Sequence, residues 1–107
     1  MASNKTDKII SHSEVSEKSI ERYLVDRVKA KGGICLKYSN PGLAGYPDRV
    51  CLLPHGVTMW FELKSKGEKL RSIQSIRIAH MRNKGHLVFV CDSKAEVDNA
   101  LDLYGKV

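Results

Sequence analysis

The chain has 107 residues, of which 42% are hydrophobic and 28% are charged. This size suits one domain with a single modest core and argues against a second independent domain. No apolar run approaches the roughly 20 residues needed to cross a bilayer, and residues 1–13 lack a signal-peptide core, so we expect a soluble cytoplasmic protein. The net charge of +6 favours an anionic partner.

The N-terminal part of the chain separates into an arm and a helix. Residues 1–13 are polar without sustained periodicity, so we expect a flexible arm ahead of one domain over residues 14–107. A helix is predicted from Ser16, which can cap its first turn, to the glycine pair at 32–33. Its apolar face recurs every four residues, at Ile20, Leu24 and Val28.

Three strands are predicted next. Residues 34–38 form the first, and a loop over residues 39–47, rich in turn-forming residues, leads straight into Asp48. Residues 49–53 and 57–64 form a hairpin around a tight turn at residues 54–56. Gly45 and Pro47 would turn the chain sharply before Asp48 and leave open backbone where a phosphodiester can approach.

The C-terminal half alternates helix, strand and helix. After a charged loop at residues 65–69, an apolar stripe predicts a helix ending at Gly85, and the apolar run 87–91 predicts an interior strand buried on both faces. Ser93 and Glu96 form a capping box for a closing helix. The stripe of the first helix is Leu70, Ile73, Ile76 and Met81, and that of the second is Val97, Ala100, Leu101 and Tyr104. The order αβββαβα predicts an α/β fold with a mixed sheet flanked by helices.

The hairpin places charged residues together. Side chains alternate along a strand, so Glu62 and Lys64 share a face, where burying them without partners would be costly. A lone E-x-K is usually a strand end that has reached solvent. Asp48, however, begins the paired strand, and the hairpin brings its carboxylate toward that of Glu62. Two hard oxygen ligands with room for water and phosphate suit Mg²⁺ or Mn²⁺.

These residues resemble a known family. Gly45-Tyr46-Pro47-Asp48, then Phe61-Glu62-Leu63-Lys64, then Gln74 on a helix, are similar to the VRR-NUC branch of the PD-(D/E)xK nuclease superfamily. The resemblance covers roughly residues 16–103, and the predicted element order matches that superfamily's core. Small stand-alone members occur in phages and bacteria and are similar to Holliday-junction resolvases.

The resemblance implies a role for each matching residue. Asp48 and Glu62 would bind the metal, and the Leu63 backbone carbonyl would add a ligand. Lys64 would orient or deprotonate the attacking water, or stabilise the pentacovalent phosphate. These three roles stay open for Lys64, because carboxylates and a metal shift a lysine pKa in opposite directions.

The family usually adds a glutamate from the first helix, and Glu17 and Glu21 compete for this role. They are four residues apart and lie on the same side of the predicted helix. A negative charge at Glu17 is explained by the helix dipole alone, since it falls in the first turn. Glu21 lies one turn deeper, so we favour Glu21 as a catalytic and metal-binding residue. The alternative for Glu21 is a partly exposed edge residue.

Several weaker candidates surround this set. The amide of Gln74 lies at the margin of its helix's apolar face and can point at the catalytic pocket, or it can be satisfied by backbone. Lys37, Lys66 and Lys69 are candidate nucleic-acid contacts, although most such lysines merely face water. Further positive charge around the second helix comes from Arg71, Arg77, Arg82 and Lys84.

The cysteines and histidines argue against other chemistry. Cys35, Cys51 and Cys91 make an odd number without a CxxC pair, and each lies in an apolar run, which predicts buried reduced thiols. The four histidines have no metal-ligand spacing with these cysteines, so we expect no zinc site.

The sequence therefore predicts an Mg²⁺- or Mn²⁺-dependent endonuclease acting on branched or otherwise structured DNA. A homodimer is expected, because symmetric junction cutting needs two active sites and the core is small. Two alternatives stay open: a basic nucleic-acid-binding module that keeps the fold without the chemistry, and a nuclease of the same fold that cuts linear DNA.

Overall fold

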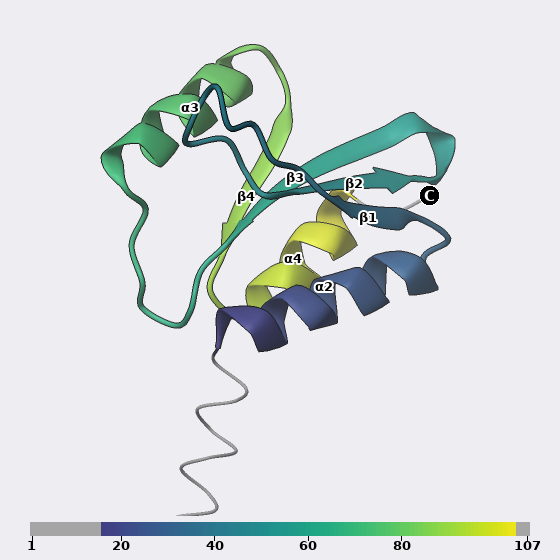
Figure 1. Cartoon of the computed structure of the whole chain (residues 1–107). Helices are drawn as coiled ribbons and strands as arrows, with labels where there is room; N and C mark the ends of the chain where they lie inside the picture. Colours follow the sequence, from purple (N-terminus) through teal and green to yellow (C-terminus); the bar gives the residue numbers. More distant parts are fainter. Residues whose placement is uncertain (1–15, 105–107) are drawn as a thin grey trace, which may run out of the picture.

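A computed structural model gives the fold of residues 16–104. The arm predicted at residues 1–13 lies outside the described residues, as do residues 105–107. The observed order is the predicted αβββαβα, with one short 3-10 turn inside the hairpin (Figure 1). The elements are α2 (Glu17–Ala30), β1 (Ile34–Lys37), β2 (Arg49–Leu53), η1 (Pro54–Gly56), β3 (Val57–Leu63), α3 (Ser72–Asn83), β4 (Leu87–Cys91) and α4 (Lys94–Tyr104).

The four strands form one mixed sheet in the order β1-β2-β3-β4. Strands β1, β2 and β3 pair antiparallel, and α3 carries the chain across to β4, which pairs parallel with β3. The predicted hairpin is confirmed. Its turn places His55 at φ 62° and Gly56 at φ 75°, the left-handed geometry in which glycine is unstrained.

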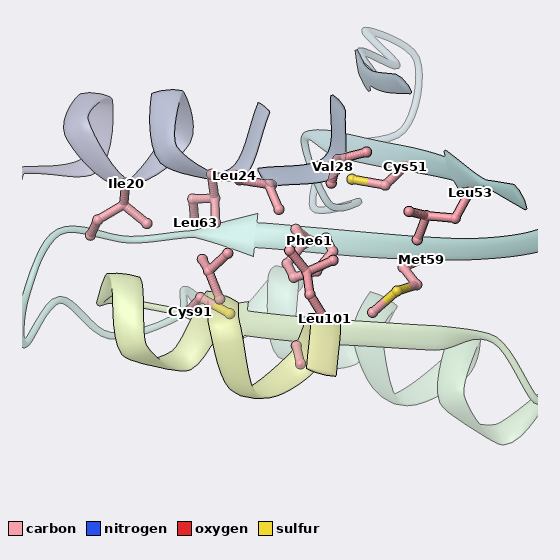
Figure 2. Packing of buried hydrophobic residues seen from close by; sticks show 12 residues of the cluster. Ile20, Leu24, Val28, Cys51, Leu53, Met59, Phe61, Leu63, Cys91 and Leu101 are labelled. Atoms are coloured by element: carbon pink, nitrogen blue, oxygen red, sulfur yellow. The ribbon is translucent and has the colours of Figure 1, made fainter. Parts of the chain in front are cut away.

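The helices divide between the two faces of the sheet. Helices α2 and α4 lie against one face and α3 against the other (Figure 1). The side chains of β3 alternate accordingly: Phe61 and Leu63 enter the core under α2 and α4, whereas Trp60 packs with Ile78 and Met81 of α3. Figure 2 shows the larger cluster, with the α2 side chains above Phe61 and Leu101 beneath it.

The helix signals read from the sequence are present as real contacts. The Ser16 hydroxyl accepts a hydrogen bond from the Ser19 N–H at 3.1 Å, and α2 buries Ile20, Leu24 and Val28 completely. At α4 the Ser93 hydroxyl accepts from the Glu96 N–H at 3.1 Å, so Ser93 caps the helix as predicted. The Glu96 carboxylate reaches back one residue further than a standard capping box and accepts from the Asp92 N–H.

Strand β4 corrects one prediction. Its apolar run indicated an interior strand, but β4 lies at the edge of the sheet. Both of its faces are nevertheless covered, since Val88 packs on the α3 side and Cys91 on the α2 and α4 side. An apolar run reports covered faces and carries no information about how many neighbouring strands pair with it.

Helix α3 corrects a second prediction. Ile76 was placed on the apolar stripe but is half exposed, and Leu70 precedes the helix. The buried face instead consists of Gln74, Ile78 and Met81. Gln74, predicted at the margin of the apolar face, is therefore buried in place of Ile76, because this face of α3 lies against the charged side chain of Glu62.

Two other sequence-based expectations bear on the surface. Cys51 and Cys91 are buried free thiols as predicted, whereas Cys35 is only half buried beside Cys51 on the paired strand. Among residues 16–104, no helix is long and apolar enough to cross a membrane.

Candidate active site

Asp48 and Glu62 come together at the open end of the β2–β3 hairpin. Arg49 pairs with Phe61, so the next position along the antiparallel register sets Asp48 beside Glu62. The main chain at Asp48 is also tied to the other neighbouring strand, since its carbonyl accepts from the Tyr38 N–H at 2.8 Å. The two carboxylates therefore sit on a backbone that is fixed from both sides.

One oxygen of the Asp48 side chain is left unsatisfied, although a hydrogen bond to its own backbone partly offsets the rise in its pKa. Its Oδ1 atom is buried and has no hydrogen-bond partner among residues 16–104, and the preceding Pro47 is fully buried. Burial raises the pKa of Asp48, and the nearby Glu21 charge raises it further. A buried carboxylate oxygen without a donor is costly by itself, and a bound cation would satisfy it.

Glu62 is almost completely buried, at 5% exposure. Its Oε2 atom lies 3.7 Å from Lys64 Nζ, whose side chain is also buried. Burial raises the pKa of Glu62 to about 7, helped by the Asp48 charge and opposed by Lys64. The Lys64 ammonium therefore offsets only part of the cost of burying two carboxylates side by side.

The amide of Gln74 is oriented toward Glu62. Gln74 is buried, and its Oε1 atom accepts from the Arg71 N–H at 2.8 Å. This leaves its Nε2 group to donate to Glu62 Oε2 at 3.2 Å. Both uses considered from the sequence occur together, because one end of the amide binds backbone at the start of α3 and the other reaches the pocket.

The two carboxylates of α2 have different surroundings. Glu21 forms an ion pair with Arg49 at 3.1 Å, and Arg49 also donates to the Cys35 carbonyl at 3.4 Å. The pKa of Glu17 is raised by partial burial and by Asp48, and the Glu17 charge in turn raises the pKa of Glu62. Arg49 was missed by the sequence reasoning, because a charged residue next to an aspartate carries no signal of its own.

The oxygen donors of Asp48 and Glu62 fit a small divalent metal ion. Within the described chain, no three Asp, Glu, His or Cys side chains form a compact cluster that would hold a metal by themselves. Asp48 Oδ1 and the Glu62 carboxylate are two hard oxygen donors at neighbouring positions of paired strands. That number suits Mg²⁺ or Mn²⁺, which take their other positions from water and substrate phosphate.

The loop before Asp48 has a different purpose from the one predicted. Gly45 was expected to leave room for a phosphodiester, but a Cβ there would lie 2.8 Å from Ile73 Cγ1 and 2.9 Å from the Ile73 carbonyl oxygen. The glycine also has φ +95°. Its missing side chain therefore lets the loop pack directly on α3, and Arg77 fastens the contact by donating to the Ala44 carbonyl at 2.9 Å.

The basic candidates divide into structural and exposed groups. Arg77 lies over the Tyr46 ring at 5.2 Å, and Arg82 donates twice to the Val88 carbonyl, so both stabilise the fold. Lys37 is exposed but shares its sheet face with Arg49, opposite to Glu62. Exposed positions near the open end of the hairpin or along α3 are Lys66, Lys69, Arg71 and Lys84.

Comparison with known proteins gives three similarities. No family model matches the chain. A curated protein named "Putative nuclease p44", from Acyrthosiphon pisum secondary endosymbiont phage 1, is 41% identical over 80 residues, which are 75% of this chain and 86% of that protein. A solved structure described as "VRR_NUC domain" is 32% identical with a TM-score of 0.77, covering 82% of this chain and 96% of its own. A second, "VRR_NUC domain protein", has a TM-score of 0.69 at 16% identity over 87% and 90% of the two chains, and supports the fold alone.

Proposed function

The chain belongs to the VRR-NUC family of nucleases, and we propose that it is a Mg²⁺- or Mn²⁺-dependent DNA endonuclease that hydrolyses phosphodiester bonds. The observation that carries this proposal is the buried group formed by Asp48, Glu62 and Lys64, with Gln74 bound to it. Burial raises the pKa of both carboxyl groups, and the Asp48 charge raises that of Glu62 further. Such an arrangement is stabilised by a divalent cation and is otherwise unfavourable.

Each side chain has a defined part in this proposal. Asp48 Oδ1 and the Glu62 carboxylate would hold the cation, and the Leu63 carbonyl between Glu62 and Lys64 would add a ligand. The bound cation would supply Lewis-acid activation of water and neutralise charge on the phosphate. Lys64 presents its ammonium to the reacting phosphate from the same strand face. Gln74 acts as a positioning residue, since its N–H donation fixes one oxygen of Glu62.

The carboxylate contributed by α2 is assigned from its surroundings. The sequence favoured Glu21, whose charge raises the pKa of Asp48 but whose carboxylate is held in an ion pair by Arg49. Glu17 influences the pKa of Glu62 and is itself influenced by Asp48. In the described residues no three carboxylates are close enough to hold a metal, so we infer that Glu17 would turn toward Asp48 and Glu62 when a cation binds, and that Glu21 holds Arg49, and thereby β2, in place beside Asp48.

The substrate and the assembly are also proposed. Branched DNA follows from the similarity of small VRR-NUC proteins to junction resolvases, and the net charge of +6 is consistent with a phosphate backbone. A homodimer would present two active sites to two strands. A surface for it exists on the β1–β2 face that α3 leaves uncovered, where Ile34, Leu36 and Leu52 are 54%, 40% and 44% exposed.

The test is cleavage of duplex, flap, splayed and four-way DNA with Mg²⁺, Mn²⁺ or EDTA. Asp48→Ala and Glu62→Ala are expected to abolish metal-dependent cleavage while the fold and much of the DNA binding persist. Undiminished cleavage by both variants would refute the assignment. Binding without cleavage by the unaltered protein favours the non-catalytic module, and equal cutting of linear duplex removes the preference for branched DNA.

A further inference from the structure

A cavity of about 500 Å³ opens on the α3 side of the sheet. Its walls come from the end of β1, the loop before Asp48, β3 and the α3–β4 corner. The cavity is lined by aromatic rings and by basic side chains that lie next to them. The side chains that matter are Tyr38, Tyr46, Trp60, His80, Lys84 and His86.

The aromatic rings form a rigid corner. The Tyr38 ring lies 5.2 Å from Trp60 at 86° and 6.5 Å from Tyr46 at 80°, both edge-to-face arrangements. Tyr38 is held by Asn40, whose Nδ2 donates to its hydroxyl at 3.1 Å, and Tyr46 is held by Arg77. A flat ligand that stacks on one of these rings therefore meets the edge of another.

The pocket adjoins the candidate active site along two segments of the chain. Tyr46 precedes Asp48 by two residues, and Trp60 precedes Glu62 by two on the same face of β3. Two residues of a strand span about 7 Å. A nucleotide whose phosphate reaches the carboxylates can thus place its base, or that of its neighbour, among the rings.

The positive charge of the cavity lining favours a nucleotide over a second copy of the chain as its ligand. His80, Lys84 and His86 line the cavity, and among residues 16–104 no acidic residue does. A second copy of the chain seated here by symmetry would bring these basic groups face to face, which is unfavourable. A nucleotide supplies both an aromatic face for the rings and a phosphate for the basic groups.

We propose that this aromatic pocket binds an unpaired nucleobase next to the scissile phosphate. The inference rests on the proposed nuclease function and narrows its substrate to DNA with an unpaired nucleotide at the cut, such as a flap or a splayed arm, or a four-way junction that opens a base pair at its branch point. A base in a continuous duplex is paired and stacked, so it cannot enter the pocket without being extruded.

The experiment uses 2-aminopurine, a fluorescent base that is quenched on stacking, at single unpaired positions of a flap substrate. The protein is the full chain with Asp48→Asn, which prevents cutting. We expect a roughly two-fold or greater loss of fluorescence at one position next to the cut, and recovery when Tyr38→Leu is added. Tyr104→Leu, the same change on α4 across the sheet, is the matched control and should leave the quenching intact.

A second measurement uses catalysis by the unaltered chain. An abasic nucleotide at the quenched position should weaken binding or cleavage about ten-fold, and Tyr38→Leu should add little to that loss because both changes remove one contact. The inference is overturned if no position is quenched. It is also overturned if the Tyr38→Leu variant keeps its melting temperature and quenches as strongly as the protein with Tyr38. A Tyr38→Leu variant whose only change is from dimer to monomer would overturn it as well. Loss of cleavage in the Asp48 and Glu62 variants without any quenching overturns this inference and leaves the nuclease assignment standing.

Discussion

Glu62 combines a buried carboxylate with a neighbouring buried ammonium. Its hydrogen bond from Gln74 and its ion pair with Lys64 satisfy one oxygen, yet burial still raises its pKa to about 7. A folded-state pKa above the unfolded value means that the folded chain binds the proton more tightly. The stability contributed by this proton is fully present below pH 4.5 and is lost as pH rises through about 7.

Glu62→Gln is therefore expected to stabilise the metal-free protein at neutral and higher pH. The variant resembles the protonated carboxyl, so in EDTA at pH 8 it should exceed the unaltered protein by an amount on the order of 3 kcal/mol. The difference should vanish near pH 4.5. Urea unfolding at several pH values measures it. Glu68→Gln is the control, because the pKa of Glu68 is shifted downward; a Glu62→Gln protein that is less stable at pH 8 would contradict the prediction.

The two α2 glutamates are separated by a paired set of substitutions. Glu17→Gln should raise the Mg²⁺ concentration needed for half-maximal cleavage by about ten-fold or more, with little change in melting temperature. Glu21→Gln should break the ion pair with Arg49 and cost about 1 kcal/mol of stability. The reverse pattern would return the ligand role to Glu21.

The loop before Asp48 packs against helix α3, and this packing holds the candidate active site together. Residues 38–48 form neither a strand nor a helix, and the hydrogen bond from the Tyr38 N–H to the Asp48 carbonyl joins the two ends of this segment. Gly45 and Arg77 attach this loop to α3, and Gln74 connects the same helix to Glu62. Helix α3 is therefore the element that joins the two halves of the site.

Gly45→Ala is expected to destabilise the protein by about 2 kcal/mol, because the residue has φ +95° and the added Cβ would collide with Ile73. Gly42→Ala is the matched control in the same loop, since its added Cβ meets nothing nearer than 3.6 Å. Thermal unfolding of both variants checks the difference. Equal melting temperatures would show that the loop is not anchored at Gly45.

The two faces of the sheet are covered unequally. Helices α2 and α4 cover one face, and α3 covers only part of the other. The uncovered part over β1 and β2 carries exposed apolar residues that are also paired in register, Ile34 with Leu52. Monomers seldom expose contiguous apolar surface without a use for it. This face is the surface from which the homodimer is proposed.

Leu52→Glu is expected to convert a dimer into a monomer, because it sets a charge in the centre of that face. Sedimentation at micromolar concentration measures the change. Leu103→Glu on α4 is the control, since Leu103 is 69% exposed on the opposite side of the sheet. A strictly monomeric unaltered protein, or a Leu52→Glu protein that remains dimeric, would reject this interface.

The element order, the hairpin and the meeting of Asp48 with Glu62 could all be predicted from the sequence. Each of these depends on local periodicity or turn chemistry, which neighbouring residues specify: Ser16 caps α2, and His55-Gly56 turns the hairpin. The family resemblance rested on the same short motifs. The shared face of Glu62 and Lys64 follows from strand alternation alone.

Which charges are paired and which faces of the sheet are covered could be seen only in the folded chain. Arg49 binds Glu21, which lies 28 positions away in the sequence. Ile73 fills the space where a side chain at position 45 would lie, and β4 is an edge strand between two layers of helices. The contact between the rings of Tyr38 and Trp60 likewise became visible only in the folded chain. These contacts join residues far apart in the chain, so they depend on how the helices lie on the sheet, which no local pattern encodes.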